Sequence, residues 1–235
     1  MDYLCRIMQK NISVILSPNK KTERLKKVLL GYNTQTYRNF ELIITFDQAD
    51  SEISSWLPDL KEEVFYTIKE IYSNVDENLQ IENLLENIET DYIIFANSNS
   101  IPRFDFIEQH VKKREEGFYL VGSKNAISKE VFNKINKQDI YSGDCFELHW
   151  LKDNGNRNNF QDRLRYSKGL FGSILNFVFS DNLKFNSENA SLWKKDMIYE
   201  KKYFNDDFFQ DIMQALQKNN IKGKQIKYTT VLIAN

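Results

Sequence analysis

The stretch DYIIFANSNSIP, from Asp91 to Pro102, joins an apolar segment directly to a short polar turn. The segment Asp91–Phe95 is dominated by β-branched and aromatic residues, which predicts a buried strand. The polar residues Asn97–Ser100 follow at its carboxyl end. In open α/β sheets, ligands bind outside the carboxyl ends of the strands. The stretch therefore predicts one strand of such a sheet, with a candidate ligand-binding turn beside it.

The rest of the first half repeats this pattern of apolar strands, polar ends and intervening helices. We expect further strands at Ile12–Leu16, Phe40–Phe46 and Val64–Ile68. Helical spacing of apolar residues separates them, at Leu25, Val28, Leu29 and Tyr32 after Thr22, and at Leu79, Ile81, Leu84, Leu85 and Ile88. Strands that alternate with helices predict parallel pairing and a doubly wound, Rossmann-like α/β sheet. The polar segments Ser17–Lys20, Asp47–Asp50 and Asn97–Ser100 are all expected at its carboxyl edge.

The second half of the chain is less regular. Its polar segment Lys137–Arg165, with interspersed aromatic residues, is typical of a long loop or variable insert that lines a substrate cleft. No repeat or linker interrupts the chain, so residues 1–235 are predicted to form a single domain. The expected elements are a helix over Phe104–Arg114, strands over Tyr119–Gly122, Lys184–Ser187 and Lys227–Ala234, and a helix over Asp207–Asn219.

Composition excludes several classes of protein. A net charge of −1 and a pI near 6.2 give no support for nucleic-acid binding. Cys5 and Cys145 have no CxxC spacing, which predicts unpaired thiols in a reducing compartment. The apolar segment Gly169–Phe179 is too short to span a bilayer, and residues Met1–Lys10 lack the apolar core of a signal peptide. We therefore expect a cytoplasmic protein without a transmembrane segment.

Several segments, in order, resemble the family 2 glycosyltransferases with the GT-A fold. NTQTYRNFELII, from Asn33 to Ile44, is similar to the family signature NQTYxNFEIII and is the most specific match. Asp91–Pro102 resembles the strand that leads into the Asp-x-Asp motif of the family. The other similar segments are Ser13–Asn19 with Glu23–Leu25, Asn189–Lys195 (family pattern GGNxSFRR) and Asp206–Asp211 (family pattern EDxEL).

The resemblance covers about residues 11 to 226. It implies a GT-A-type sheet with a nucleotide-binding half over about 11–122 and a variable acceptor-side half over about 123–235. It also implies a nucleotide-sugar donor and a glycan or lipid-linked acceptor. The implied reaction transfers the sugar to an acceptor hydroxyl, in bacterial surface polysaccharide synthesis. Peripheral association with the inner face of a membrane is compatible with it.

The resemblance also suggests roles for individual residues. Asp211 stands where the family commonly has its catalytic base, and Asp207 is the fallback as a helix cap or acceptor contact. His149 and Trp150 are candidate acceptor contacts, because imidazole and indole rings stack on sugars and hydrogen-bond to hydroxyls. The implied donor-binding residues are Pro18, Asp47, Asn97, Asn99 and Asn189, with Asp47 facing the nucleotide base.

Asn97 and Asn99 depart from the family, because they replace the two aspartates of its metal motif. In that motif, carboxylates hold Mn²⁺ or Mg²⁺, which neutralises the departing diphosphate. Asparagine offers a carbonyl oxygen but no charge, and one ion pair at about 4 Å is worth roughly 4 kcal/mol before desolvation. We therefore expect weak metal binding at Asn97 and Asn99. Lys194 and Lys195 could hold the diphosphate instead, although such lysines are ordinarily on the surface.

Each of these sites also has a purely structural interpretation. Asn97–Asn99 could be a polar turn and Asp47 a turn residue. Asp211 could simply complement the amino end of its helix, and His110, in mid-helix, is expected to be structural or exposed. If the metal motif is lost, the alternative function is a catalytically inactive nucleotide-sugar or glycan-binding protein derived from a glycosyltransferase.

Overall fold

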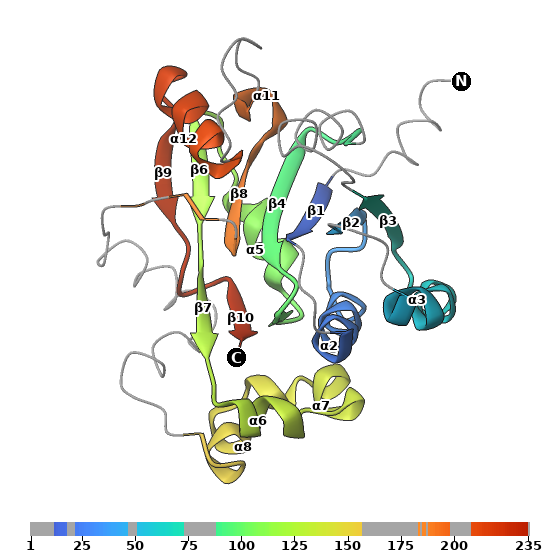
Figure 1. The fold of residues 1–235 in the computed structure, drawn as a ribbon. Coiled ribbons are helices and arrows are strands. Elements are labelled where there is room, and N and C mark those ends of the chain that lie inside the picture. Colours follow the sequence, from blue (N-terminus) through green and yellow to red (C-terminus); the bar gives the residue numbers. More distant parts are fainter. Residues whose placement is uncertain are drawn as a thin grey trace.

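The structure is a computed structural model that describes residues 12–17, 22–46, 51–72, 88–156, 183, 185–186, 188–197 and 208–234. Within these ranges a seven-stranded sheet forms the centre of the molecule (Figure 1). In order across the sheet, its strands are β3 (Thr67–Tyr72), β2 (Phe40–Phe46), β1 (Ile12–Ser17), β4 (Tyr92–Asn97), β8 (Asn189–Trp193), β6 (Phe118–Val121) and β9 (Lys222–Gln225).

The pairing in this sheet is mainly parallel, as the sequence predicts. Strands β3, β2, β1 and β4 are parallel neighbours, and β6 is parallel to β9. Only β8 runs antiparallel to its two neighbours, β4 and β6, among the strands that the structure describes. Because β1 lies between β2 and β4, the order of the strands reverses there. Such a switch point opens a crevice at the carboxyl edge of the sheet.

Apolar residues on both faces of the strands create two cores. Along β1, Ile12, Val14 and Leu16 point into one core, whereas Ile15 points into the other. This alternation follows from the two-residue period of a strand whose two faces are both covered. The first core is covered by α2 (Thr22–Tyr32), α3 (Ser51–Glu63) and α5 (Phe106–Lys113), and the second by α11 (Lys194–Met197) and α12 (Phe208–Lys218).

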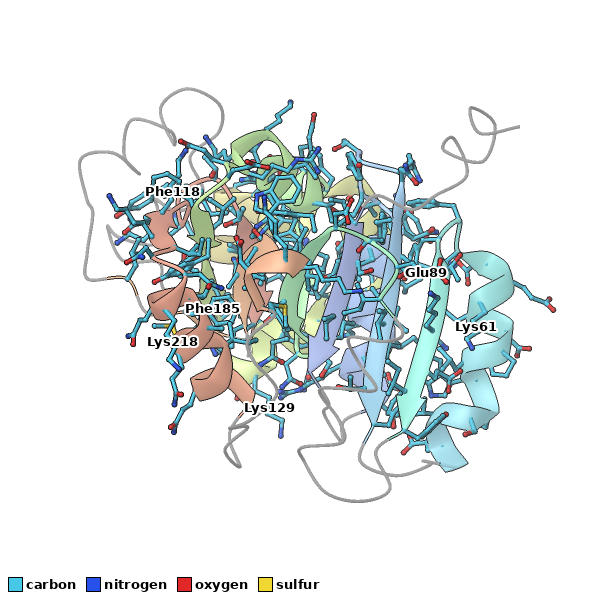
Figure 2. All side chains as sticks on the ribbon, turned by 90° about the horizontal axis from the view of Figure 1, so that it is seen from above. Lys61, Glu89, Phe118, Lys129, Phe185 and Lys218 are labelled. Atoms are coloured by element: carbon cyan, nitrogen blue, oxygen red, sulfur yellow. The ribbon has the colours of Figure 1, made fainter. Side chains whose placement is uncertain are left out.

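A smaller sheet continues from the main one. β7 (Ser123–Ala126) follows β6 after Gly122, and it pairs with β10 (Val231–Ala234), which also pairs with β5 (Ser100–Pro102). Four short helices follow β7 and pack against the first core. They are α6 (Lys129–Lys134), α7 (Lys137–Ser142), the 3₁₀ helix η1 (Asp144–Phe146) and α8 (Leu148–Asp153). Figure 2 places Lys61 of α3 and Lys218 of α12 at opposite sides of the molecule, near the two outer strands of the main sheet.

Several expected elements differ from the structure. The strand expected at Val64–Ile68 begins only at Thr67, because residues 64–66 form a bend after α3. The loop expected over Lys137–Arg165 is wrong for residues 137–153, which are largely helical. Asn136 begins this region with a capping box, and its side chain accepts hydrogen bonds from two backbone N–H groups of α7.

The strands expected near the end of the chain are also shifted. In the segment Lys184–Ser187, the two described residues are not in a strand, and β8 begins at Asn189. The closing strand begins at Val231, because residues 227–229 form a turn. The expected helices over Phe104–Arg114 and Asp207–Asn219 are confirmed as α5 and α12. The remaining expected segments, Leu79–Leu85, Gly169–Phe179 and residues 157–165 of the loop, lie outside the described residues.

Two further expectations concern cysteine and the membrane. Cys145 is a free, buried thiol, and burial raises its pKa to about 12. Cys5 lies outside the described residues. None of the helices in the described part of the chain has the length and apolar character needed to cross a bilayer.

Candidate functional site at the carboxyl edge of the sheet

The carboxyl ends of the central strands lie together at one edge of the main sheet. Ser17, the last residue of β1, is the register partner of Asn97, the last residue of β4. β2 ends nearby at Phe46, two residues beyond the pairing of Leu16 with Ile44. Pro18 and Asp47 lie outside the described residues, but each directly follows a strand that ends at this edge. We refer to this edge as the carboxyl edge.

The asparagine turn after β4 is held by its own side chain. The backbone N–H of Asn99 donates to Asn97 Oδ1 at 2.8 Å, which is the hydrogen bond of an Asx turn. Asn97 Nδ2 donates at 3.3 Å to Oε1 of Glu188, the residue directly before β8. The two asparagines are thus on the same turn, and one of them faces a carboxylate.

Lys124 completes this cluster from β7. Its Nζ donates to the same Oε1 atom of Glu188. The Lys124 and Glu188 side chains are 40% and 37% exposed, so both charged groups are accessible from solvent. Neither residue was among the sequence-predicted site residues. The sequence offers one hint of a role for Glu188, which directly precedes the Asn189–Lys195 segment. Nothing in the sequence pairs Glu188 with Lys124, which lies 64 positions earlier.

Several buried polar atoms around the asparagine turn have no hydrogen-bond partner among the residues that the structure describes. They include the hydroxyl oxygens of Ser98 and Ser100 and the side-chain oxygen of Asn99. Buried polar groups are normally paired, and leaving one unpaired costs about 1–3 kcal/mol. A ligand, an ion or a water molecule could satisfy these atoms.

Asn189 lies beside this cluster but its amide is fully engaged. It is 1% exposed. Its Nδ2 donates at 2.8 Å to the backbone carbonyl of Ser123 and at 3.4 Å to that of Thr230. The amide therefore ties β8 to β7 and to the turn before β10. A Cβ atom on Gly122 would approach Asn189 Oδ1 to 2.3 Å, so the chain needs glycine there.

His110 orients Asn189 from α5, and it is structural rather than exposed. His110 Nε2 lies 3.1 Å from Asn189 Oδ1, which can only accept, so Nε2 carries the proton. His110 Nδ1 then accepts from the Ser191 hydroxyl at 2.8 Å, and Ser191 accepts from Tyr92. Complete burial lowers the His110 pKa to about 3, despite the opposing hydrogen bond to Asn189, so the ring is neutral at pH 7.

Lys194 and Lys195 lie at the opposite, amino edge of the sheet. In the antiparallel pair of β4 and β8, Asn189 is opposite Ala96, whereas Trp193 is opposite Tyr92. The two lysines are therefore roughly 15–20 Å from the carboxyl edge, at about 3.3 Å per strand residue. Lys194 Nζ donates to the Ile88 carbonyl at 2.5 Å. The suggestion that these lysines hold a diphosphate beside Asn97 is wrong.

The candidate base and acceptor residues are placed only in part. Asp211 belongs to the first turn of α12, and Asp207 lies outside the described residues. α12 ends at the amino edge, where Lys222 N donates to the Gly117 carbonyl. Its first turn is therefore directed toward the carboxyl edge (Figure 1). His149 and Trp150 lie on α8, where Trp150 Nε1 donates to Asp139 of α7 at 3.1 Å.

The described residues of the carboxyl edge do not fit a divalent metal ion. No group of three or more His, Cys, Asp or Glu side chains in the described ranges could hold one. The donor set beside β4 consists of two amides and one carboxylate, and that carboxylate is paired with Lys124. Mn²⁺ and Mg²⁺ prefer several oxygen ligands with negative charge among them.

Comparison with known proteins shows the fold. No protein-family model matches the sequence, and no curated protein matches it. Among solved structures, the mannosyltransferase PcManGT from Pyrobaculum calidifontis, in complex with GDP-Man and Mn²⁺, matches 94% of this chain with a TM-score of 0.58 at 12% identity. S. aureus TarS matches 96% with a TM-score of 0.56 at 10% identity. TarS 1–349 in complex with UDP matches 95% with a TM-score of 0.54 at 10% identity.

This chain spans only part of each of these proteins, 56% of PcManGT, 36% of TarS and 60% of TarS 1–349. At such low identities the likeness concerns the fold alone. The chain has a GT-A-like glycosyltransferase fold, with a large, mostly parallel sheet flanked by helices.

Proposed function

We propose that this protein is a glycosyltransferase that takes a sugar from a nucleoside-diphosphate donor. The observation that carries the proposal is the polar cluster around Asn97, because it lies at the switch point of a GT-A-like sheet. The structures of PcManGT and TarS 1–349 contain GDP-Man and UDP, respectively, which supports a nucleotide-linked donor here.

In the proposed reaction, an acceptor hydroxyl attacks the anomeric carbon of the donor sugar. Asp211 takes the hydroxyl proton, and the nucleoside diphosphate leaves. We assign the nucleotide base to Asp47 and the donor contacts to Pro18, Asn97 and Asn99. The acceptor side is assigned to His149, Trp150 and Asp207.

For Asn189 the hydrogen bonds support an indirect role in donor binding. Its amide atoms bond to His110, Ser123 and Thr230. We therefore assign Asn189 a positioning role. It fixes β7, and also Glu188, which precedes Asn189 in the sequence, relative to β4. The proposed acceptor is a glycan or a lipid-linked saccharide, and the proposed setting is surface polysaccharide synthesis at the cytoplasmic face of a membrane.

A thermal-shift panel tests the first half of this proposal. A ligand that binds only the folded state stabilises it by about 2.7 kcal/mol at a concentration 100 times its Kd. We expect one of UDP, GDP, CDP or dTDP to raise the melting temperature, whereas the corresponding nucleoside has a smaller effect. Equal, negligible shifts with all four nucleotides, with or without Mn²⁺, would refute nucleotide binding.

The second candidate function is a binding protein that has lost catalysis. The specific observation in its favour is the absence of carboxylates at Asn97 and Asn99, where the motif of the family carries its charge. Release of nucleoside diphosphate from UDP- and GDP-sugars, measured with glycan and lipid-linked acceptors, separates the two functions. Nucleotide binding without turnover for every donor and acceptor pair would favour the binding protein.

A further inference from the structure

Binding of the proposed donor places negative charge at the carboxyl edge, and this charge must be neutralised. A diphosphate group carries negative charge, and this charge grows on the leaving group during transfer. The described residues there do not fit a divalent metal, because Asn97 and Asn99 are neutral and Glu188 is already paired. A cation from the protein itself is the remaining source of positive charge within the described part of the site.

Lys124 is positioned to be that cation. Its ammonium contacts Glu188 Oε1, the same oxygen that accepts a hydrogen bond from the Asn97 side chain. The ammonium and the Asn97 side chain thus bond to the same carboxylate oxygen. Asn97 stands at the first position of the motif that holds the metal in the glycosyltransferases that this chain resembles. By contrast, Lys194 and Lys195 are at the far end of β8.

The backbone around Lys124 is fixed, whereas its side chain is accessible. The neighbouring Ser123 accepts a hydrogen bond from Asn189 through its carbonyl, and Lys124 itself is the register partner of Leu232 in β10. The side chain is 40% exposed, and exposed ion pairs contribute little to stability. Exchanging the carboxylate of Glu188 for a phosphate oxygen therefore costs little.

We propose that the Lys124 ammonium takes the place of the divalent metal, binding the donor diphosphate and neutralising it as it leaves. Glu188 is a positioning residue that holds the ammonium beside Asn97 until the diphosphate arrives. This inference rests on the proposed function, since it assumes that a nucleoside diphosphate binds at the carboxyl edge. It assigns to this chain a nucleotide site that works without Mn²⁺ or Mg²⁺.

The experiment is calorimetric titration of the native protein with UDP, GDP, CDP and dTDP, in EDTA and in Mn²⁺. We expect the best nucleotide to bind equally well under both conditions. Lys124→Gln should weaken this binding by about 10- to 100-fold, the range for losing a hydrogen bond to a charged group. Lys224→Gln is the matched control, since Lys224 is 42% exposed and pairs with Glu115 at 2.7 Å, on the amino side of the sheet.

A second variant, at Glu188, changes nucleotide affinity in opposite directions depending on whether Glu188 binds a metal or only pairs with Lys124. Glu188→Gln releases the ammonium from its carboxylate, so we expect metal-free nucleotide binding to become severalfold tighter. If Glu188 held a metal instead, the same variant would abolish Mn²⁺-dependent binding. Melting curves of both variants verify that each one is folded.

The possible outcomes separate this inference from the proposed function. Binding that requires Mn²⁺ and is unchanged in Lys124→Gln would overturn the role of Lys124 and leave the proposed function intact. Binding of none of the four nucleotides under either condition would overturn the proposed function, and the role of Lys124 with it.

Discussion

The two ends of the β4–β8 pair use charged residues in different ways. At the amino edge, Arg114 lies over the rings of Tyr92 and Trp193, at 5.8 and 5.4 Å from their centres. Lys194 there donates to a backbone carbonyl. At the carboxyl edge, Lys124 and Glu188 are half-exposed and pair through their side chains. In the asparagine turn there, buried hydroxyl and amide oxygens have no partner within the described ranges.

We interpret this difference as one between a structural edge and the proposed binding edge, although one buried polar atom without a partner among the described residues, Asp196 Oδ2, lies at the amino edge. Cations over aromatic faces and on backbone carbonyls already contact groups of the protein, and these contacts stabilise the end of the strand pair. Unpartnered polar atoms cost stability, and a ligand, an ion or a water molecule can offset that cost. Exposed lysine–glutamate pairs occur at both edges, since Lys195 pairs with Glu116 and Lys124 with Glu188. What distinguishes Lys124 is that its glutamate also accepts a hydrogen bond from the asparagine turn.

The largest effect is expected for the proposed base, Asp211. Asp211→Asn keeps the size of the side chain and removes its basicity, so turnover should fall by roughly 10²–10⁴ while nucleotide affinity is retained. Release of nucleoside diphosphate, measured with a productive donor and acceptor pair, gives the rate.

Asp207→Asn is the comparison variant for this experiment, because Asp207 lies one helical turn before Asp211 in the sequence. We expect it to lose less activity than Asp211→Asn. Undiminished turnover in Asp211→Asn would remove the assignment of the base, and with it the main reason for placing the first turn of α12 in the site.

The next effect concerns the charge missing from the β4 turn. Asn97→Asp combined with Asn99→Asp restores two carboxylates beside Glu188. We expect Mn²⁺-dependent affinity for a nucleoside diphosphate to rise by about 10- to 100-fold, since each nearby opposite charge contributes up to roughly 4 kcal/mol before desolvation. Calorimetry with and without Mn²⁺ measures the gain. Tight Mn²⁺-dependent binding by the native chain, with no gain in the double variant, would contradict our interpretation of the asparagines.

A smaller effect on stability is expected from His110, which supports the carboxyl edge through Asn189. Its pKa is about 3 when folded, against an ordinary value of 6.5, so between these values only the unfolded chain is protonated. Proton binding to the unfolded chain lowers stability as the pH falls below 6.5, by about 2 kcal/mol at pH 5.

Urea unfolding of the native protein and of His110→Gln, at pH 7 and pH 5, isolates this contribution. The variant lacks the titrating ring, so its stability should fall less between the two pH values. An identical fall in both proteins would mean that His110 is not held neutral by its burial.

The sequence predicts the central strands well, because their pattern is strong and local. β1, β2 and β4 are short apolar runs that end in polar residues, and parallel pairing follows from the helices between strands. α3 is missed although Ile53, Leu57 and Leu60 have helical spacing, since Pro58 and the neighbouring serines weaken the pattern. A proline can be tolerated there because the buried face of the helix compensates for the lost hydrogen bond.

The candidate site was predicted less completely, for a different physical reason. The asparagine turn is local and can be read directly from residues 97–99. The pair Lys124–Glu188 joins β7 to the residue before β8, and only the antiparallel insertion of β8 between β4 and β6 brings them together. Likewise, Asn189 resembles a donor contact in sequence, whereas its burial and its bond to His110 depend on the packing of α5.

The smallest effect is expected at the amino edge, where Lys195 pairs with Glu116 at 3.1 Å. Their side chains are 57% and 77% exposed, and such pairs contribute about 0–1 kcal/mol because water and salt screen the charges. Lys195→Gln should therefore change the free energy of unfolding by no more than that, and nucleotide affinity not at all. Urea unfolding and calorimetry on this variant, beside Lys124→Gln, test the contrast between the edges directly. Loss of nucleotide affinity in Lys195→Gln would show that the amino edge takes part in binding, which the register of β8 against β4 argues against.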